Sequence, residues 1–150
     1  MINRYAQPGR VVWIGLRPAR RSAMVPVDAA SMMTDGLDGD RSRAGKRAVT
    51  LVQWEYLAAI GAYLGREAVM PEILRRNLVI SDINLASLKG RAIQVGQAKL
   101  RLTAVCAPCS RMEEALGPGG YAAVRGHGGW CAEVLESGPV SLHDPVTPID

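Results

Sequence analysis

Short apolar runs, separated by turn-forming residues, occur along most of the chain. Val11–Leu16 and Ala48–Val52 are continuous apolar runs with β-branched side chains, which predicts buried strands. Residues Lys99–Val105 instead alternate polar and apolar positions, as expected of a strand with one buried face. The same reasoning predicts an extended region at Pro26–Asp28 and further strands at Asn77–Ile80, Ile93–Gly96, Cys131–Leu135 and Val140–Val146.

Helical periodicity is confined to a smaller part of the chain. Apolar residues recur at helical spacing from Trp54 to Leu64, and Gly65 ends this pattern. A second, short helix is predicted from Ser110, whose spacing to Glu113 is that of a capping box, to Gly117. Because strands dominate, we predict a single mainly β (α+β) domain over residues 1–150, with a sheet curled into a barrel and a few short flanking helices.

The composition is that of a globular domain, with 48% hydrophobic and 21% charged residues. No segment approaches the roughly 20 apolar residues that a membrane-spanning helix needs, and the first residues lack the apolar run of a secretory signal. We therefore expect a cytoplasmic protein with no membrane partner. The net charge is +4, but no basic stripe with interleaved aromatic residues or helix-turn-helix pattern occurs, so no nucleic-acid partner is expected.

The most informative local segment is Cys106-Ala107-Pro108-Cys109-Ser110-Arg111. Cys109 immediately precedes the predicted N-cap Ser110, where free amide groups and the helix dipole favour negative charge, and Arg111 adds a cation. This setting predicts a lowered pKa for Cys109, and the thiolate is the form of cysteine that acts as a nucleophile or metal ligand.

Alternatives to this interpretation remain open. Free cysteines are often simply small buried residues. Cys106, Cys109, His127 and Cys131 also have the spacing of zinc ligands, so a zinc-stabilised domain is an alternative. A thioredoxin-like pair is disfavoured because the turn-rich pattern lacks alternating strands and helices.

Two loops have the composition of a ligand-binding surface. The loop after Gly39 carries Asp40, Arg41, Arg43, Lys46 and Arg47, which suits an anionic group, although a solvated run of charges is the alternative. It is not a phosphate-binding loop of the Walker type, because five residues rather than four separate its glycines. The segment 126–129 exposes its backbone amides, and His127 within it is a candidate proton donor or acceptor near neutral pH.

Taken together, these motifs resemble the MOSC domain, named for the C-terminal domain of molybdenum cofactor sulfurases. The resemblance covers about residues 11–146. The matching stretches are Gly36–Arg41, Arg47–Leu51, Leu74–Ser81, Ile83–Leu85, Gly90 with Ile93 and Gly96, Cys106–Glu113 and Arg125–Gly129. The combination of Cys-x-x-Cys-Ser-Arg with Arg-Arg-Asn-Leu is more specific than either motif alone.

The resemblance implies a pocket for molybdenum cofactor or a related sulfur-bearing ligand. The family's cysteine matches Cys109, which in relatives is proposed to carry sulfur as a persulfide or to ligate molybdenum. Arg75, Arg76 and Asn77 match the stretch that lines the cofactor side. Where relatives often read Gly-Asp-Arg-His, this chain has Ser42, so a histidine that could relay protons is missing.

These features lead to a functional hypothesis of a standalone MOSC protein, active in sulfur transfer or in molybdenum-dependent reduction of N-hydroxylated compounds. Its expected catalytic residues are Cys109, also the molybdenum ligand, and His127. The expected cofactor-binding residues are Asp40, Arg41, Arg47, Arg75, Arg76, Asn77, Arg111 and Gly128. A non-catalytic module that delivers cofactor or sulfur is the alternative. The expected partners are the small-molecule cofactor or substrate and a redox or sulfur-donor protein, and pyridoxal phosphate is not expected in this domain alone.

Overall fold

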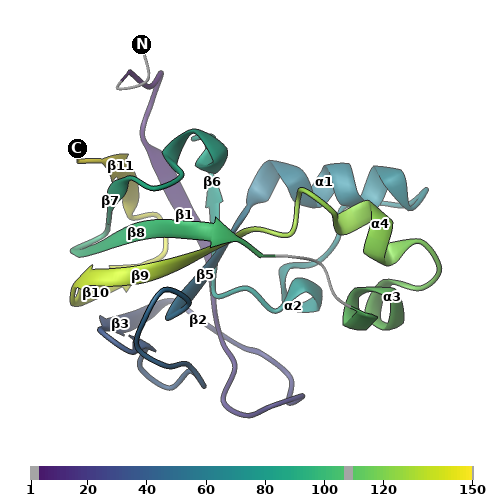
Figure 1. The fold of residues 1–150 in the computed structure, drawn as a ribbon, viewed down its shortest axis with the longest axis horizontal. Coiled ribbons are helices and arrows are strands. Elements are labelled where there is room, and N and C mark those ends of the chain that lie inside the picture. The colour runs from purple at the N-terminus through teal and green to yellow at the C-terminus, as the bar shows by residue number, and fades with distance from the viewer. Residues whose placement is uncertain (1–3, 107–109, 150) are drawn as a thin grey trace.

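The computed structural model describes residues 4–106 and 110–149 (Figure 1). The strands found there are β1 (Gly9–Leu16), β2 (Val25–Val27), β3 (Ala29–Met33), β4 (Gly36–Leu37), β5 (Val49–Gln53), β6 (Leu78–Ser81), β7 (Ala92–Val95), β8 (Ala98–Val105), β9 (Trp130–Glu136), β10 (Gly138–Ser141) and β11 (Pro145–Pro148). The helices are α1 (Trp54–Tyr63), α2 (Pro71–Leu74), the 3-10 helix η1 (Leu85–Leu88), α3 (Ser110–Leu116) and α4 (Gly120–Val124).

Seven of these strands close into a barrel in the order β1, β6, β5, β9, β8, β7 and β11. Closure occurs where β11 returns to β1, with Gly9 opposite Val146 and Arg10 opposite Pro145. The other half of β1 pairs instead with β2, from Ile14 to Leu16. The predicted mainly β class, with a curled barrel and short flanking helices, is confirmed.

The pair β5 and β6 runs parallel, whereas the other barrel neighbours are antiparallel. Parallel neighbours need a long crossover connection, and here α1 and α2 lie within it. Figure 1 shows the four α-helices together on one side of the molecule, while β7, β11 and the two termini lie on the other. The barrel therefore has one face covered by helices.

The hydrophobic core has two parts, which explains why β5 is a continuous apolar run. Leu51 belongs to the cluster inside the barrel, and the neighbouring Val52 belongs to a second cluster beneath the helices. All five residues of β5 are buried as a result. A strand covered on both faces needs no polar side, so β5 lacks the alternation of polar and apolar residues that a half-buried strand shows.

The strand predicted at Val140–Val146 is wrong, because the chain turns in its middle. Residues Gly138–Ser141 pair with β3 in a separate three-stranded sheet, and Pro145–Pro148 pair with β7 in the barrel. His143 adopts a positive φ of 74° at this turn, and a carboxylate oxygen of Asp144 accepts a hydrogen bond of 2.7 Å from the amide of Ser141. The side chain of Asp144 thus stabilises the change of sheet.

The capping box predicted at Ser110 is also wrong, although a helix spans Ser110–Leu116. The Glu113 carboxylate accepts hydrogen bonds of 3.0 Å from the amides of Gly119 and Tyr121, at the start of α4. These two hydrogen bonds lower the pKa of Glu113 from its ordinary value. Glu113 therefore caps the following helix rather than its own.

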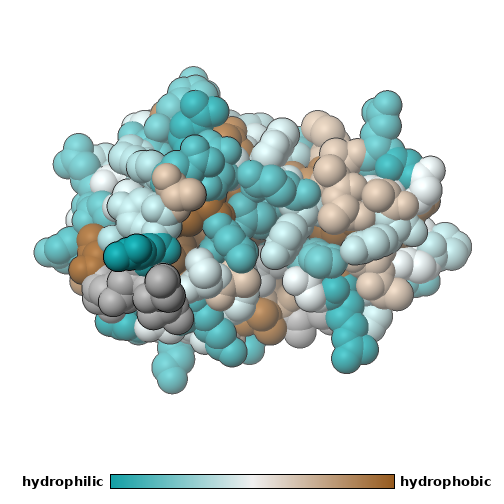
Figure 2. Space-filling view, turned by 90° about the horizontal axis from the view of Figure 1, so that it is seen from above, coloured by the Kyte–Doolittle hydropathy of each residue, from teal (hydrophilic) through white to brown (hydrophobic). Residues whose placement is uncertain are grey.

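One face of the molecule is mostly polar. Figure 2 shows a face dominated by hydrophilic side chains, on which the most hydrophobic residues appear only in small, separated patches. No helix in the described ranges 4–106 and 110–149 combines the length and the apolar character that crossing a bilayer requires.

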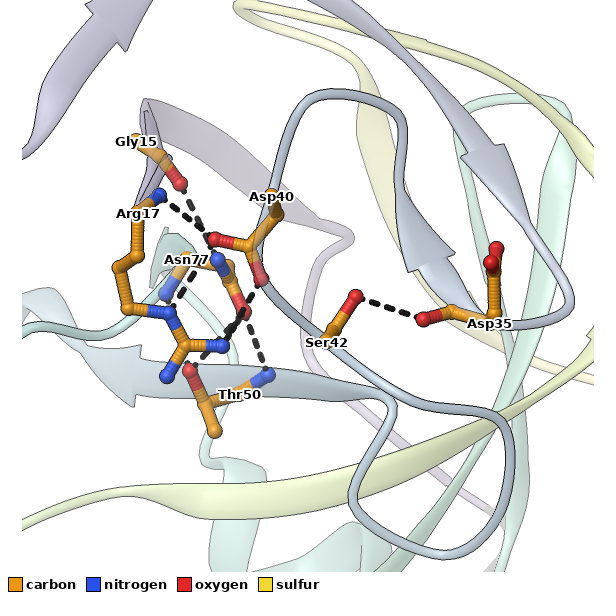
Figure 3. Close-up of polar contacts among 7 residues, drawn as sticks. All are labelled: Gly15, Arg17, Asp35, Asp40, Ser42, Thr50 and Asn77. Atoms are coloured by element: carbon orange, nitrogen blue, oxygen red, sulfur yellow. Dashed lines mark hydrogen bonds and ion pairs between the residues drawn. The ribbon is translucent and has the colours of Figure 1, made fainter. Parts of the chain in front are cut away.

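One buried side chain, that of Asn77, joins three barrel strands at the end where the candidate site lies. Its carbonyl oxygen accepts hydrogen bonds of 3.1 Å from both the amide and the hydroxyl of Thr50 in β5. Its amide nitrogen donates to the carbonyl of Gly15 in β1, at 3.1 Å (Figure 3). Because Asn77 directly precedes β6 and is fully buried, it fixes the relative positions of these three strand ends.

We predict that Asn77→Ala lowers the free energy of unfolding by about 3 kcal/mol, since buried partners in β1 and β5 lose their hydrogen bonds. Urea unfolding followed by tryptophan fluorescence measures this loss. The control is Asn84→Ala, which removes an exposed cap of η1 and should cost about 1 kcal/mol or less. Equal effects of the two substitutions would contradict the structural role given to Asn77.

Candidate functional site

Two cysteines lie side by side where β8 ends and β9 begins. The sulfur atoms of Cys106 and Cys131 are 3.5 Å apart, within hydrogen-bonding distance for thiols. The amide of Cys106 donates a 2.8 Å hydrogen bond to the carbonyl of Gly129, which continues the pairing of the two strands. The register is irregular between Leu102 and Ala104, and Ala104 is the residue opposite Cys131. The strand pairing therefore positions the two thiols together.

A partly buried ion pair holds one arginine beside this strand end. The Asp40 side chain has no exposed surface and accepts a 2.9 Å hydrogen bond from the guanidinium of Arg17. Asp40 also accepts a 2.6 Å hydrogen bond from the Arg17 backbone amide, and the Asn77 carbonyl oxygen lies 3.3 Å from the same guanidinium (Figure 3). A charge pair removed from water keeps its geometry only when its remaining hydrogen bonds are satisfied. The Arg17 guanidinium is thus held in a set position.

Further guanidinium groups converge near the cysteines. Arg76 donates a 2.6 Å hydrogen bond to the carbonyl of Gly128, and this bond anchors its side chain. A cavity of about 320 Å³ results, lined by Arg17, Arg47, Thr50, Arg76, Val105, Cys106 and Cys131. A second cavity of about 530 Å³ shares Arg17 and Arg47 with the first and is otherwise lined by Arg41, Ser42, Arg43, Ala44 and Lys46. Together they form one strongly cationic recess, which we call the arginine pocket.

This environment favours a thiolate at Cys131. The hydrogen bond with Cys106 lowers the pKa of Cys131 to about 6, and the nearby cations of Arg47, Arg76 and Arg17 act in the same direction against burial. The pKa of Cys106 is raised, first by the hydrogen bond with Cys131 and then by burial. Cys131 is therefore the thiol of the pair that ionises more readily, and Cys106 is the one that more readily keeps its proton.

The predicted cofactor-binding residues are only partly brought together. Arg41, Arg47 and Arg76 line the arginine pocket, and Asp40 orients Arg17 behind it. Asn77 also lies at this barrel end, but it is fully buried and its polar atoms bond to β1 and β5, so a role as a cofactor ligand stays a prediction.

Arg75 and Arg111 lie elsewhere. They line a different cavity, of about 410 Å³, with Arg21, Glu114 and Ala115. Burial lowers the pKa of Arg75, and the positive charges of Arg17, Arg111 and Arg41 lower it further, so these cations face one another across a short distance. The charges of Arg17 and Arg41 in the arginine pocket thus reach Arg75 in this separate cavity.

Crowding around residue 128 explains why glycine occupies this position. A Cβ atom there would lie 3.0 Å from a methyl group of Val124 and 3.2 Å from the carbonyl of Cys106. Glycine lets the 126–129 segment approach the strand end closely enough for its carbonyl to bind Arg76. Gly128 therefore contributes a carbonyl that positions a cation, while the ligand-binding role expected of its backbone amide stays a prediction.

The described residues do not assemble the zinc site considered from the sequence. Among the described residues, no three histidine, cysteine or carboxylate side chains lie close enough to hold a metal ion, so His127 does not join Cys106 and Cys131. Its ring packs instead against Tyr56 and Tyr63 of α1, with ring centroids 4.8 Å and 5.7 Å away. The predicted catalytic residue Cys109 lies outside the described residues.

Three residues of the arginine pocket were not predicted as parts of a binding site from the sequence: Arg17, Thr50 and Cys131. Arg17 does have a signal in the sequence, because it directly follows the first apolar run at the end of a barrel strand. Cys131 was considered only as a zinc ligand. Its contact with Cys106 depends on the pairing of β8 with β9, which no local motif indicates.

We predict that the thiolate absorbance of a Cys109→Ser variant titrates with a midpoint near pH 6, owing to Cys131. Adding Cys106→Ala should raise this midpoint, because the hydrogen bond that lowers the pKa most is lost. Adding Cys131→Ala instead of Cys106→Ala should abolish the low midpoint, and a low midpoint that persists in this variant would contradict the assignment to Cys131.

The lowered pKa of Cys131 also makes the stability of the fold depend on pH. Because this pKa is below its ordinary value of 9.0, the thiolate stabilises the fold above about pH 9, and this contribution is lost as the pH falls towards about 6.

Solved structures with this fold are known. The chain is similar to the YUAD protein from Bacillus subtilis, with a TM-score of 0.80 and 18% identity over 93% of this chain and 94% of that one. It is also similar to YiiM from Geobacillus stearothermophilus, with a TM-score of 0.78 and 17% identity over 95% of this chain and 76% of that one. For YiiM from Escherichia coli the TM-score is 0.72 and the identity 19%, over 94% and 70% of the two chains. At these identities the likeness shows a shared fold.

No curated protein sequence matches the chain significantly. The family model of the MOSC domain does match, over residues 38–147. That range runs from the arginine-rich loop through both described cysteines to the closing strand of the barrel. The chain belongs to the MOSC domain family.

Proposed function

We propose that the arginine pocket binds molybdenum cofactor, or a related anionic sulfur-bearing ligand, and that Cys109 ligates its molybdenum or carries a sulfane sulfur. The observation that carries this proposal is the convergence of Arg17, Arg47 and Arg76 on one cavity at the barrel end. Membership of the MOSC family makes the cofactor the natural ligand to test first.

The chemistry of the lining fits such a ligand. A pterin cofactor carries a phosphate group, and guanidinium groups bind phosphate through paired charge-assisted hydrogen bonds. Arg17 is already oriented by Asp40, so little side-chain entropy is lost when it binds an anion. The Thr50 hydroxyl adds a neutral polar group to the same wall. When bound, the cofactor would supply a metal centre capable of two-electron chemistry.

The residues around the cavity have separable roles in this proposal. Arg47 is exposed and free to move towards an incoming phosphate, whereas Arg76 is anchored by the Gly128 carbonyl. Arg41, Arg43 and Lys46 extend the positive surface and attract anions from solution. In the sequence, Cys109 comes four residues after Val105, the last residue of β8, and three after Cys106, which lines the pocket. A thiolate suits both proposed roles, since it is a soft metal ligand and a good sulfur acceptor.

We predict that Cys109→Ser abolishes molybdenum loading while leaving thermal unfolding unchanged. Purified protein is incubated with molybdenum cofactor released from a donor protein, and bound molybdenum is then measured by elemental mass spectrometry alongside pterin fluorescence. Loading of the Cys109→Ser protein at the wild-type level would overturn the role given to this residue.

We further predict that Arg47→Gln weakens pterin binding about tenfold, the usual loss for a single charge-assisted hydrogen bond. The matched control is Arg10→Gln, at the opposite end of β1, which should bind as the wild type does. Equal binding by both variants would place the cofactor outside the arginine pocket.

A second experiment separates an enzyme from a delivery module. An electron donor and a hydroxylamine substrate are added to the loaded protein; an enzyme turns the substrate over, and a delivery module does not.

A further inference from the structure

We propose that Cys106 and Cys131 form a redox-active dithiol at the edge of the arginine pocket. In this proposal Cys131 reacts with a small peroxide, and Cys106 then closes a disulfide across β8 and β9. This site differs from the one assigned to Cys109, and its formation does not depend on a bound cofactor.

The geometry favours an intramolecular disulfide. The sulfur atoms are 3.5 Å apart, and the adjacent strands are held by the hydrogen bond from the Cys106 amide to the Gly129 carbonyl. A disulfide bond is about 2.05 Å long, so the sulfurs need to approach by only about 1.5 Å.

The surroundings make the pair reactive as well as close. A sulfur nucleophile must be ionised and accessible, and both thiols line the 320 Å³ cavity. Arg17, Arg47 and Arg76 face the pair from three different segments and stabilise the thiolate. Cys106 is partly exposed, Cys131 is buried except where it lines this cavity, and the two sulfur atoms are within hydrogen-bonding distance. A cavity of this size admits hydrogen peroxide, which has only two heavy atoms.

The reaction balances with the peroxide as the named oxidant. The Cys131 thiolate attacks one peroxide oxygen, the O–O bond breaks, and the departing hydroxide takes a proton and leaves as water. The resulting sulfenic acid is attacked by the Cys106 sulfur, which loses its proton as the S–S bond forms and a second water leaves. Two thiols are oxidised by two electrons in total, and one peroxide is reduced to two waters.

Oxidation also changes the charge of the arginine pocket. In the reduced state the Cys131 thiolate neutralises part of the positive charge of Arg17, Arg47 and Arg76. A disulfide carries no charge, so an incoming anion no longer competes with the thiolate for these cations. We therefore infer that oxidation strengthens anion binding in the pocket. This consequence rests on the proposed function, whereas formation of the disulfide does not.

The first experiment maps the disulfide. Wild-type protein is treated with one equivalent of hydrogen peroxide, blocked, digested and analysed by mass spectrometry without reduction. The expected product joins Cys106 to Cys131 within one chain and leaves Cys109 free. A disulfide that contains Cys109, a bond between two chains, or two unreacted thiols in the folded protein would each overturn the proposal.

Matched variants in a Cys109→Ser background assign the two roles. With Cys106→Ser, peroxide should leave a sulfenic acid on Cys131 that dimedone traps, because the resolving thiol is gone. With Cys131→Ser, the remaining Cys106 should react many times more slowly. Faster trapping on Cys106 than on Cys131 would overturn the assigned order of attack.

The charge effect is measured with inorganic phosphate as the probe. Calorimetry compares reduced and oxidised protein in the Cys109→Ser background, and phosphate affinity should rise several-fold on oxidation. The Cys106→Ala and Cys131→Ala double variant in the same background should show no change with peroxide. Disulfide formation without a change in phosphate affinity would refute the charge effect and count against the anion-binding pocket, while leaving the redox site intact.

Discussion

The hydrogen bonds of the Asn77 amide are the constraint on which the rest of the site depends. This single buried side chain joins β1, β5 and β6 at one end of the barrel. Its carbonyl oxygen also contacts Arg17, whose charge is balanced by the buried carboxylate of Asp40. Strand pairing alone leaves the ends of a barrel free to fray. Here a shared polar group holds three strand ends together and sets the direction of a cation at the same time.

The site combines such fixed groups with more mobile ones. Arg17 and Arg76 are each tied to a neighbouring acceptor, whereas Arg47 is exposed. Between them lie two thiols, of which Cys131 ionises more readily than Cys106. A pocket of this kind discriminates by charge first, because guanidinium groups face it from separate segments of the chain. Its affinity for an anion then depends on how much of that charge the protein itself neutralises.

Much of the fold was predictable from the sequence, for reasons that individual elements make clear. The run at Ala48–Val52 and the periodic segment from Trp54 are local patterns, and both elements are found as expected. The division of Val140–Val146 between two sheets was not predicted, since it depends on the left-handed conformation of His143, which the apolar pattern does not indicate. The short helices α2 and α4 are too brief to show periodicity.

The candidate site was less predictable, because its contacts join segments far apart in the chain. The arginine-rich loop was identified from composition, but the partner of Asp40 is Arg17, 23 residues earlier. The contact between the two thiols spans 25 residues and depends on an irregular register between β8 and β9. Composition therefore indicated that arginine side chains and thiols would form the site. Their positions relative to one another followed only from the strand pairing.

The closing pair of the barrel has a consequence for how the protein folds. The seam joins Gly9 to Val146, so the two partners are separated by 146 − 9 = 137 positions. Contacts of such long range cost loop-closure entropy before they contribute any stability, which slows folding. Until β1 pairs with β11, each of these strands presents unpaired backbone groups that neighbouring chains are able to bind. Chaperone assistance should thus matter most for this protein during the interval before the seam closes.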